Sequence, residues 1–221
     1  MRKIKFETNE YYHIYNRGNN KRDMFFNEHD YIRFLFLILV FQAPITAHNI
    51  NRDVNYFLKH KKFNLTPQRK NEILKRRNIE LTSFTLMPNH FHLIVNERNG
   101  TGIASYMQRL QNSYTKYCNT KHNFSGHLLQ GPFQAVHITT NDQLLYLSAY
   151  IHKNQRELNE WKNKEHLYTW SSYYDYTIEN RWGELLARNI IIDQFKNPKK
   201  YQDFVKNSAA KEKNDSTLFI D

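Results

Sequence analysis

The stretch IELTSFTLMPNHFHLIVN, residues 79–96, decides the fold of this chain. Its two halves, residues 79–87 and 90–96, are rich in β-branched, aromatic and other apolar residues, a composition typical of strands. Pro88 and Asn89 between them are turn-forming residues. We therefore expect two antiparallel strands joined as a β-hairpin.

Side chains alternate between the two faces of a strand, which divides the second half of this hairpin. Phe91, Leu93 and Val95 fall on one face, while His90 and His92 fall on the other. The apolar face is expected to bury against helices. The face with both imidazoles is expected to look away from that core, toward a functional site or toward water.

Working outward, strands and helices flank the hairpin in a regular order. A strand is expected over residues 10–16 and a well-buried helix over residues 28–42. After the hairpin, a helix is expected over residues 102–121 and a short strand over residues 132–138. This order predicts an α+β fold, a ferredoxin-like antiparallel sheet (βαββαβ) with helices on one face, followed by a C-terminal tyrosine-bearing helix.

Composition narrows the class of protein. Hydrophobic residues make up 40% of the 221 residues, enough for a buried core. Cys118 is the only cysteine, which excludes an intrachain disulfide and a cysteine-rich zinc site. The longest apolar run, residues 34–41, is shorter than the roughly 20 residues that span a bilayer, and the N-terminus lacks an apolar signal core. We expect no membrane partner and a cytoplasmic location.

The charge is strongly positive and concentrated in one segment. Lys and Arg number 32 against 21 Asp and Glu, a net charge of +11. Residues 45–78 have the character of a basic helical insertion, and an excess of this kind favours nucleic acid as a partner over a merely basic surface. The residues of the insertion that we expect to contact DNA are Lys59, Lys61, Lys62, Arg76 and Arg77.

The two histidines of the hairpin form a candidate metal pair. His90 and His92 are two residues apart on one strand face, so their Cα atoms lie about 7 Å apart and their imidazoles can converge on one cation. Two protein ligands leave coordination positions for a third ligand and for a phosphate oxygen. A pair of surface histidines with no metal is the alternative that this short motif leaves open.

A helix expected from Asp142 to about Trp161 carries candidate partners for this pair. Tyr150 and Asn154 are one helical turn apart and border the apolar stripe that faces the sheet. The phenol is a candidate nucleophile and the amide oxygen a candidate third metal ligand. An ordinary phenol has a pKa of about 10, so its attack needs help from a metal, a base or a cation. Because the chain has 15 tyrosines, spacing alone does not select this one.

Five segments in a fixed order carry a family resemblance. The chain resembles the transposases that have a histidine–hydrophobic–histidine (HUH) motif and one catalytic tyrosine, particularly the REP-associated tyrosine transposases. The segments are YHIYNRG (12–18), LMPNHFHLIV (86–95), SYMQRLQNSYTKYCNTKHNFSGHLLQGPF (105–133), YIHKNQ (150–155) and WSSYYDY (170–176). Departures include Gln155 and Pro132, where relatives often have proline and arginine, respectively.

This resemblance implies a metal-dependent enzyme that acts on single-stranded or hairpin DNA. By position, Tyr150 corresponds to the nucleophile, which forms a 5′-phosphotyrosine before the strand is rejoined. His90, His92 and Asn154 correspond to the ligands of a divalent cation, Mg²⁺ or Mn²⁺, and two imidazoles with an amide suit manganese better. Relatives work as monomers or dimers, so a homodimer stays open.

The resemblance also sets the remaining expectations. Arg17 lies in the NRG motif, and Arg17, Lys21 and Arg22 are expected near DNA phosphates in a nucleoid-associated protein. The catalytic domain is expected over residues 1–180 and a C-terminal extension, loose at its end, over residues 181–221.

Two other functions stay open. A domesticated DNA-binding protein that no longer cuts would use the same basic and aromatic residues. A His-dependent phosphoesterase with alternating histidines needs a third one, where this chain has Ile94.

Overall fold

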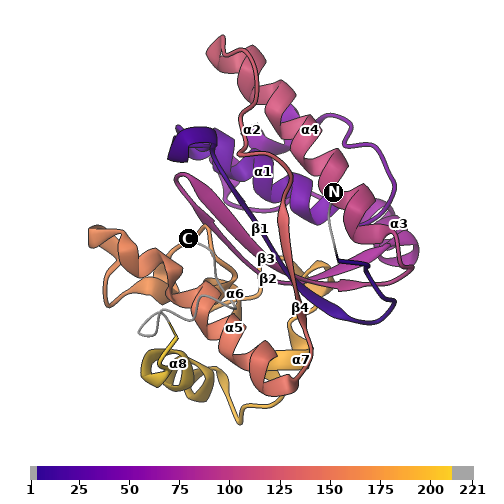
Figure 1. Ribbon diagram of the computed structural model, residues 1–221. Coiled ribbons are helices and arrows are strands. Elements are labelled where there is room, and N and C mark those ends of the chain that lie inside the picture. Colours follow the sequence, from indigo (N-terminus) through magenta and orange to yellow (C-terminus); the bar gives the residue numbers. More distant parts are fainter. Residues whose placement is uncertain (1–3, 211–221) are drawn as a thin grey trace.

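A four-stranded antiparallel sheet forms the centre of the computed structural model, which describes residues 4–210 (Figure 1). The strands lie in the order β2-β3-β1-β4, and the β2–β3 pair closes tightly at Met87 and His90, so the predicted hairpin is confirmed. This strand order is the one expected of a ferredoxin-like βαββαβ sheet, and the predicted fold class is confirmed. The strands are β1 (Tyr11–Arg17), β2 (Ile79–Met87), β3 (His90–Glu97) and β4 (Gln134–Ile138).

One face of the sheet packs against α1 (Glu28–Val40) and α4 (Gly102–His122). The apolar face of β3 lies here, as its alternation predicts, with the Phe91 ring 5.1 Å from that of Phe34 on α1. The N-terminus of α4 is capped by the fully buried carboxylate of Glu97, which accepts hydrogen bonds from the first two amides of the helix at 3.0 and 2.8 Å.

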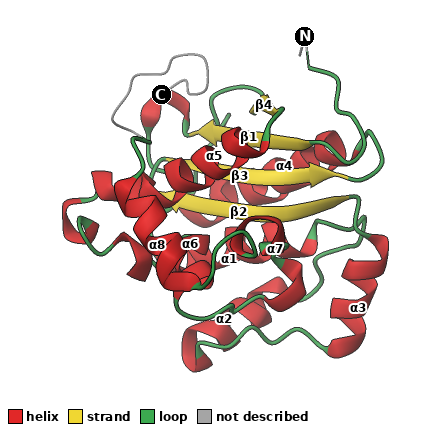
Figure 2. Cartoon of the chain, turned by 90° about the horizontal axis from the view of Figure 1, so that it is seen from below, coloured by secondary structure: helices red, strands yellow, loops and turns green. Residues whose placement is uncertain are grey.

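The opposite face is covered by α5 (Asn141–Lys153) and α6 (Ser172–Thr177), and α8 (Pro198–Asn207) packs on these two helices. Figure 1 shows all three on the other side of the sheet from α1 and α4. Figure 2, viewed from this side, shows α5 in front of the strands. The histidine face of β3 therefore meets the tyrosine-bearing helix and does not simply face water, so the fold has helices on both faces of the sheet.

The tyrosine helix differs from its prediction at both ends. It ends at Lys153 and not near Trp161, and it begins at Asn141, just before Asp142. Its N-cap is Thr140, whose side chain accepts from Gln143 N at 3.1 Å. No proline or glycine marks the early end. The chain instead tightens into short 3₁₀ turns, η2 (Asn154–Glu157), η3 (Asn159–Trp161) and η4 (Glu165–Leu167), with Asn154 and Gln155 fully buried.

The basic insertion folds as two helices, α2 (Ile50–His60) and α3 (Pro67–Arg76), and α2 packs on α1, away from α5 (Figure 1). Residues 181–210 continue the same core, because Trp182 and Tyr201 are buried in it. The remaining short helices are η1 (Asn19–Lys21), η5 (Gly183–Leu185) and α7 (Asn189–Ile192).

Across residues 4–210, no helix combines the length and the apolar character needed to cross a membrane. The chain end after residue 210, which the sequence predicts to be loose, lies outside the described residues.

Candidate active site

A cavity of about 560 Å³ opens beside the two histidines of β3. Strand pairing explains its composition, since β1 lies next to β3 with Tyr15 opposite His92 and Arg17 opposite His90, and opposite residues project from the same face. The lining residues that matter for the chemistry are Tyr15, Arg17, Lys21, His90, His92 and Glu157.

His90 and His92 lie close together, as their spacing predicts. Their ring centroids are 5.2 Å apart and the ring planes are nearly perpendicular. His92 is almost fully buried and His90 is half-buried. The two imidazoles are therefore held by the strand, and both line the cavity.

His90 is placed between two amide oxygens. Its Nδ1 lies 2.7 Å from Asn89 Oδ1, and its Nε2 lies 2.9 Å from Asn154 Oδ1. A neutral imidazole has only one N–H, so it cannot donate to both oxygens. With the Nδ1 proton directed at Asn89, the Nε2 lone pair faces the oxygen of Asn154. In that tautomer both atoms are acceptors, a pair that could hold a metal ion.

Asn154 comes to this position from the first 3₁₀ turn after α5. Its side chain is fully buried, and among residues 4–210 its Nδ2 atom has no hydrogen-bond partner. Its Oδ1 atom is the end that contacts the site, 2.9 Å from His90 Nε2, and burying the unpartnered Nδ2 is costly.

Tyr150 lies in the same cluster. Its ring centroid is 5.6 Å from that of His92, with the planes nearly perpendicular, and the residue is 3% exposed. The structure thus brings Tyr150, His90, His92 and Asn154, the four residues named from the sequence, together within one chain.

His13 also belongs to this cluster, although the sequence analysis did not single it out. Its Nε2 lies 2.9 Å from Nδ1 of His92, and its ring is 6.4 Å from that of Tyr150. Burial lowers the pKa of His13 to about 3, so its imidazole is neutral at physiological pH. The only sequence signal was its position in YHIYNRG, two residues before Tyr15 on the same strand face.

The basic residues predicted to bind DNA separate into two groups. Arg17 and Lys21 line the cavity, and Arg17 Nε donates to Gln130 Oε1 at 2.5 Å. Arg22 is directed elsewhere: it donates to the His127 carbonyl at 2.8 Å, and its guanidinium lies 5.4 Å from the centre of the Phe124 ring.

The residues of the insertion do not line the cavity. Three of them are paired with acidic side chains: Lys61 with Glu28 at 2.8 Å, Arg76 with Glu72 at 2.9 Å, and Arg77 with Glu80. Lys59 and Lys62 are exposed. The surface they occupy belongs to the α2–α3 side of the molecule, which faces away from α5 (Figure 1).

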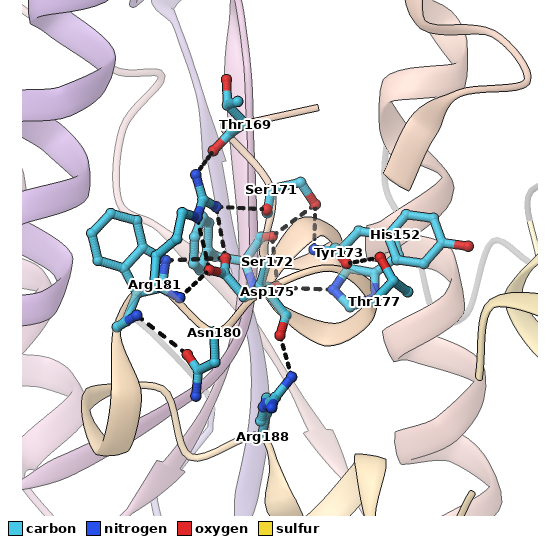
Figure 3. A network of polar contacts seen from close by, with 12 residues as sticks. His152, Thr169, Ser171, Ser172, Tyr173, Asp175, Thr177, Asn180, Arg181 and Arg188 are labelled. Atoms are coloured by element: carbon cyan, nitrogen blue, oxygen red, sulfur yellow. Dashed lines mark hydrogen bonds and ion pairs between the residues drawn. The ribbon is translucent and has the colours of Figure 1, made fainter. Parts of the chain in front are cut away.

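A polar network fastens the tyrosine helix to the sheet (Figure 3). His152, two residues after Tyr150, contacts Ser172 Oγ through Nε2 at 2.8 Å, and Ser172 Oγ accepts from the Phe84 amide of β2 at 2.9 Å. Arg181 holds the adjoining part of α6, because its Nε and Nη2 donate hydrogen bonds of 2.8 and 2.7 Å to the carboxylate of Asp175. The position of Tyr150 therefore depends on contacts outside the cavity.

Residues 58–154 match the family model described as "Transposase IS200 like". The matched segment runs from the end of α2 through β2, β3, α4 and β4 to the end of α5, so it contains both histidines, Tyr150 and Asn154. A comparison with curated protein sequences gives no match.

Among solved structures, one described as the REP-associated tyrosine transposase bound to a REP hairpin matches this chain with a TM-score of 0.53. The match covers 79% of this chain and 82% of the other, at 13% sequence identity, which shows a common fold. The family match and the shared fold confirm the resemblance seen in the sequence: the chain is similar to the IS200-like and REP-associated tyrosine transposases.

Proposed function

We propose that this protein is a transposase that cleaves and rejoins single-stranded DNA through a covalent 5′-phosphotyrosine, with hairpin or repeat DNA as its target. The observation that carries the proposal is the convergence of Tyr150 and Asn154 on His90 and His92, the two histidines that line the cavity. The family match and the hairpin-bound structural relative support the same class of substrate.

The donor atoms suit a divalent cation. His90 and His92 each contact a neighbour through Nδ1, Asn89 and His13 respectively, so Nε2 is the nitrogen through which each ring would bind a metal. The 2.9 Å between His90 Nε2 and Asn154 Oδ1 is close to the separation of adjacent ligands around an octahedral ion with bonds of about 2.1 Å. Imidazole nitrogens favour manganese over magnesium in this set.

Among residues 4–210, no group of three or more His, Cys, Asp or Glu side chains could hold a metal. The third protein ligand in this proposal is accordingly the amide oxygen of Asn154. A cation held by these three residues would withdraw charge from a DNA phosphate and so assist attack by an oxygen nucleophile.

Tyr150 supplies that nucleophile. Its phenol oxygen bonds to phosphorus as the bond from phosphorus to the 3′ oxygen breaks, and the departing strand takes a proton to become a 3′-hydroxyl. The phosphotyrosine is itself a diester, so the 3′-hydroxyl of another strand can attack it and release the phenol. Arg17 and Lys21 would hold the phosphates of the strand at the cavity.

The four side chains belong to one chain, so a monomer holds a complete set and a homodimer is not required. We further propose that residues 1–180 form the catalytic domain, with residues 45–78 inserted and residues 181–221 as an extension. The family match lies wholly within the first of these ranges.

The decisive experiment is to incubate the protein with end-labelled single-stranded hairpin DNA and manganese, and to look for an adduct that survives denaturation. We expect an adduct in the wild type and in Tyr146→Phe, the matched control one turn earlier on α5, and none in Tyr150→Phe. Binding of the hairpin by Tyr150→Phe should stay near the wild-type level.

An adduct that persists in Tyr150→Phe would overturn the assignment of the nucleophile. Normal hairpin binding with no adduct in any variant would instead favour the domesticated DNA-binding protein. A phosphoesterase with three alternating histidines has no support here, because the third position is Ile94, which is fully buried.

A further inference from the structure

We propose that Phe26 is a stacking platform for one unpaired DNA base outside the cavity. This inference rests on the proposed function, because it adds a second contact with the same DNA. Among residues 4–210, Phe26 is the only Phe, Tyr or Trp that is exposed, and the residue is 42% exposed. The flat face of such a ring binds unpaired bases by stacking, whatever the base.

Neighbouring groups hold Phe26 in place. The ring centroids of His122, at the end of α4, and of Phe124 lie 4.6 and 5.5 Å from that of Phe26. The backbone amide of Phe26 donates to the buried carboxylate of Asp30 at 3.0 Å, and His122 Nε2 lies 3.3 Å from the same oxygen. The exposed ring is therefore fixed before DNA arrives, so a base that stacks on it requires little ordering of the protein.

Positive charge accompanies these rings, which suits a partner that carries phosphates. The guanidinium of Arg22 lies 5.4 Å from the centre of the Phe124 ring. Arg22 donates to the backbone carbonyl of His127 at 2.8 Å and forms no ion pair among residues 4–210, so its charge is available to a phosphate. Aromatic rings interleaved with cations are typical of surfaces that bind single-stranded nucleic acid.

A protein partner fits this surface less well. A stable protein interface buries about 1,200 Å² or more, far beyond the area of one exposed ring. The other large apolar residues that are exposed among residues 4–210 belong to η4, to α7 and to the turn after α6, and not to this surface. They are Leu167, Ile178 and Ile190.

The platform continues from the rim of the cavity. Lys21 lines the cavity, and Arg22 follows it in the chain. The loop after α4 connects the same two places, because it carries Phe124 near its start and the cavity residue Gln130 near its end. A DNA strand whose phosphate contacts Lys21 can therefore continue along Arg22 to Phe26.

The occupant is an unpaired base of the hairpin substrate, either in its loop or in the single strand beside its stem. Bases within the stem already stack on their neighbours, so their faces are closed to a side chain. An unpaired base has an open face, and stacking on Phe26 shields both rings from water.

Three substitutions separate stacking from other effects. Phe26→Tyr keeps an aromatic face, Phe26→Leu keeps apolar bulk without one, and Phe26→Ala removes both. We expect Phe26→Ala to weaken hairpin binding by about 5- to 150-fold, the range for the loss of one stacked base. Phe26→Tyr should stay within a few-fold of the wild type, and Phe26→Leu should fall close to the alanine variant. The matched control is Leu167→Ala, which shortens a side chain on a residue of equal exposure, 42%, outside this surface.

Fluorescence anisotropy of labelled hairpin DNA measures the affinity, in EDTA so that no metal-dependent cleavage occurs. The dependence of affinity on salt should stay at its wild-type slope in Phe26→Ala, because stacking releases no counterions. The base analogue 2-aminopurine, placed in turn at each unpaired position, gives a readout that a change in folding alone would not move. The wild type and Phe26→Tyr should quench its fluorescence at one position, and Phe26→Leu should not. Thermal melting verifies that each variant is folded.

Wild-type affinity in folded Phe26→Ala would overturn the platform, and so would quenching in Phe26→Leu equal to that in the wild type. The second result decides the matter even where Phe26→Ala does not fold. If Phe26→Ala binds DNA normally but loses a self-association seen in the wild type, the ring belongs to an interface between copies of this chain and the inference is wrong.

The two proposals fail in different ways, because binding and quenching are measured without metal and without cleavage. A wild type that forms no adduct, with weakened hairpin binding in Phe26→Ala, refutes only the proposed cleavage chemistry. A wild type that forms the adduct, with normal hairpin binding in Phe26→Ala, refutes only the platform.

Discussion

Replacing Arg181 with leucine is expected to destabilise the protein through the buried carboxylate of Asp175. That carboxylate is 0% exposed and accepts two charged hydrogen bonds from Arg181, at 2.8 and 2.7 Å, and one from Trp182 Nε1 at 3.0 Å (Figure 3). The substitution leaves the bond from Trp182 and a bond of 3.1 Å from the backbone amide of residue 181, and it removes both bonds from the guanidinium. It also removes the bond from Arg181 Nη1 to the Thr169 carbonyl at 2.9 Å.

The expected loss is large for a single change. Removing one partner of a buried ion pair costs about 3–5 kcal/mol, because the other charge stays buried. In a protein of this length each kcal/mol lowers the melting temperature by about 2–4 °C, so the variant should melt about 6–20 °C below the wild type. Arg76→Leu is the matched control, since its exposed pair with Glu72 is worth about 1 kcal/mol or less.

The loss should depend on pH in a definite direction. Burial raises the pKa of Asp175 above its usual value, although Arg181 and Trp182 act against the rise. Without Arg181 the pKa in the folded state rises further, so the folded protein holds a proton that the unfolded chain releases. Stability of the variant then falls as pH rises from about 4 through the folded pKa. The penalty is therefore smallest in acid and largest at neutral pH.

Thermal and urea denaturation followed by circular dichroism between pH 4.5 and 7.5 measure these effects. The double variant Asp175→Asn/Arg181→Leu should be more stable at neutral pH than Arg181→Leu alone, because no uncompensated charge remains. Arg181→Leu melting within about 2 °C of the wild type at neutral pH, with no dependence on pH, would refute the reasoning.

Two further predictions concern the cavity and the core. Replacing Arg17 and Lys21 with glutamine should weaken binding of single-stranded DNA and reduce the slope of log affinity against log salt concentration by about 0.7 per lost phosphate contact. Fluorescence anisotropy measures the slope, with Lys59→Gln/Lys62→Gln as the control. An unchanged slope would place the strand elsewhere. Burial alone would raise the pKa of Asp30, but hydrogen bonds from Lys121 and Tyr117 hold it below its usual value, so its contribution to stability is lost as pH falls below about 4. Asp30→Asn should therefore lower the unfolding free energy by about 1.5–3 kcal/mol at neutral pH, and urea titrations should show the difference vanishing in acid.

Periodicity made much of this fold predictable from the sequence. The alternation in residues 79–96 predicts both strands of the hairpin and the face to which His90 and His92 belong. The one-turn spacing of Tyr150 and Asn154 predicts that they lie on one side of their helix. These features depend on neighbours within a few residues, so they can be read from short stretches of the sequence.

The end of the tyrosine helix was not predictable in that way. Leu158 continues its apolar stripe, and the sequence therefore extends the helix to about Trp161. In the structure the helix stops at Lys153, where the next two side chains bond to the sheet and to a later loop: Asn154 to His90, and Gln155 to Thr85 and the Glu165 carbonyl. Burial of these polar groups outweighs the local preference for more helix.

The sequence by itself determined which side chains share one face of an element. It placed two histidines on one face of a strand, and a tyrosine and an asparagine on one side of a helix. Only the tertiary structure decided that they meet, because His90 and Asn154 are 64 positions apart and His13 and His92 are 79 apart. Those contacts depend on β1 lying beside β3 in one register and on α5 being fastened to β2. The register of the strands and the docking of α5 are set by the packing of the whole core, so the spacing of residues in a short stretch does not predict them.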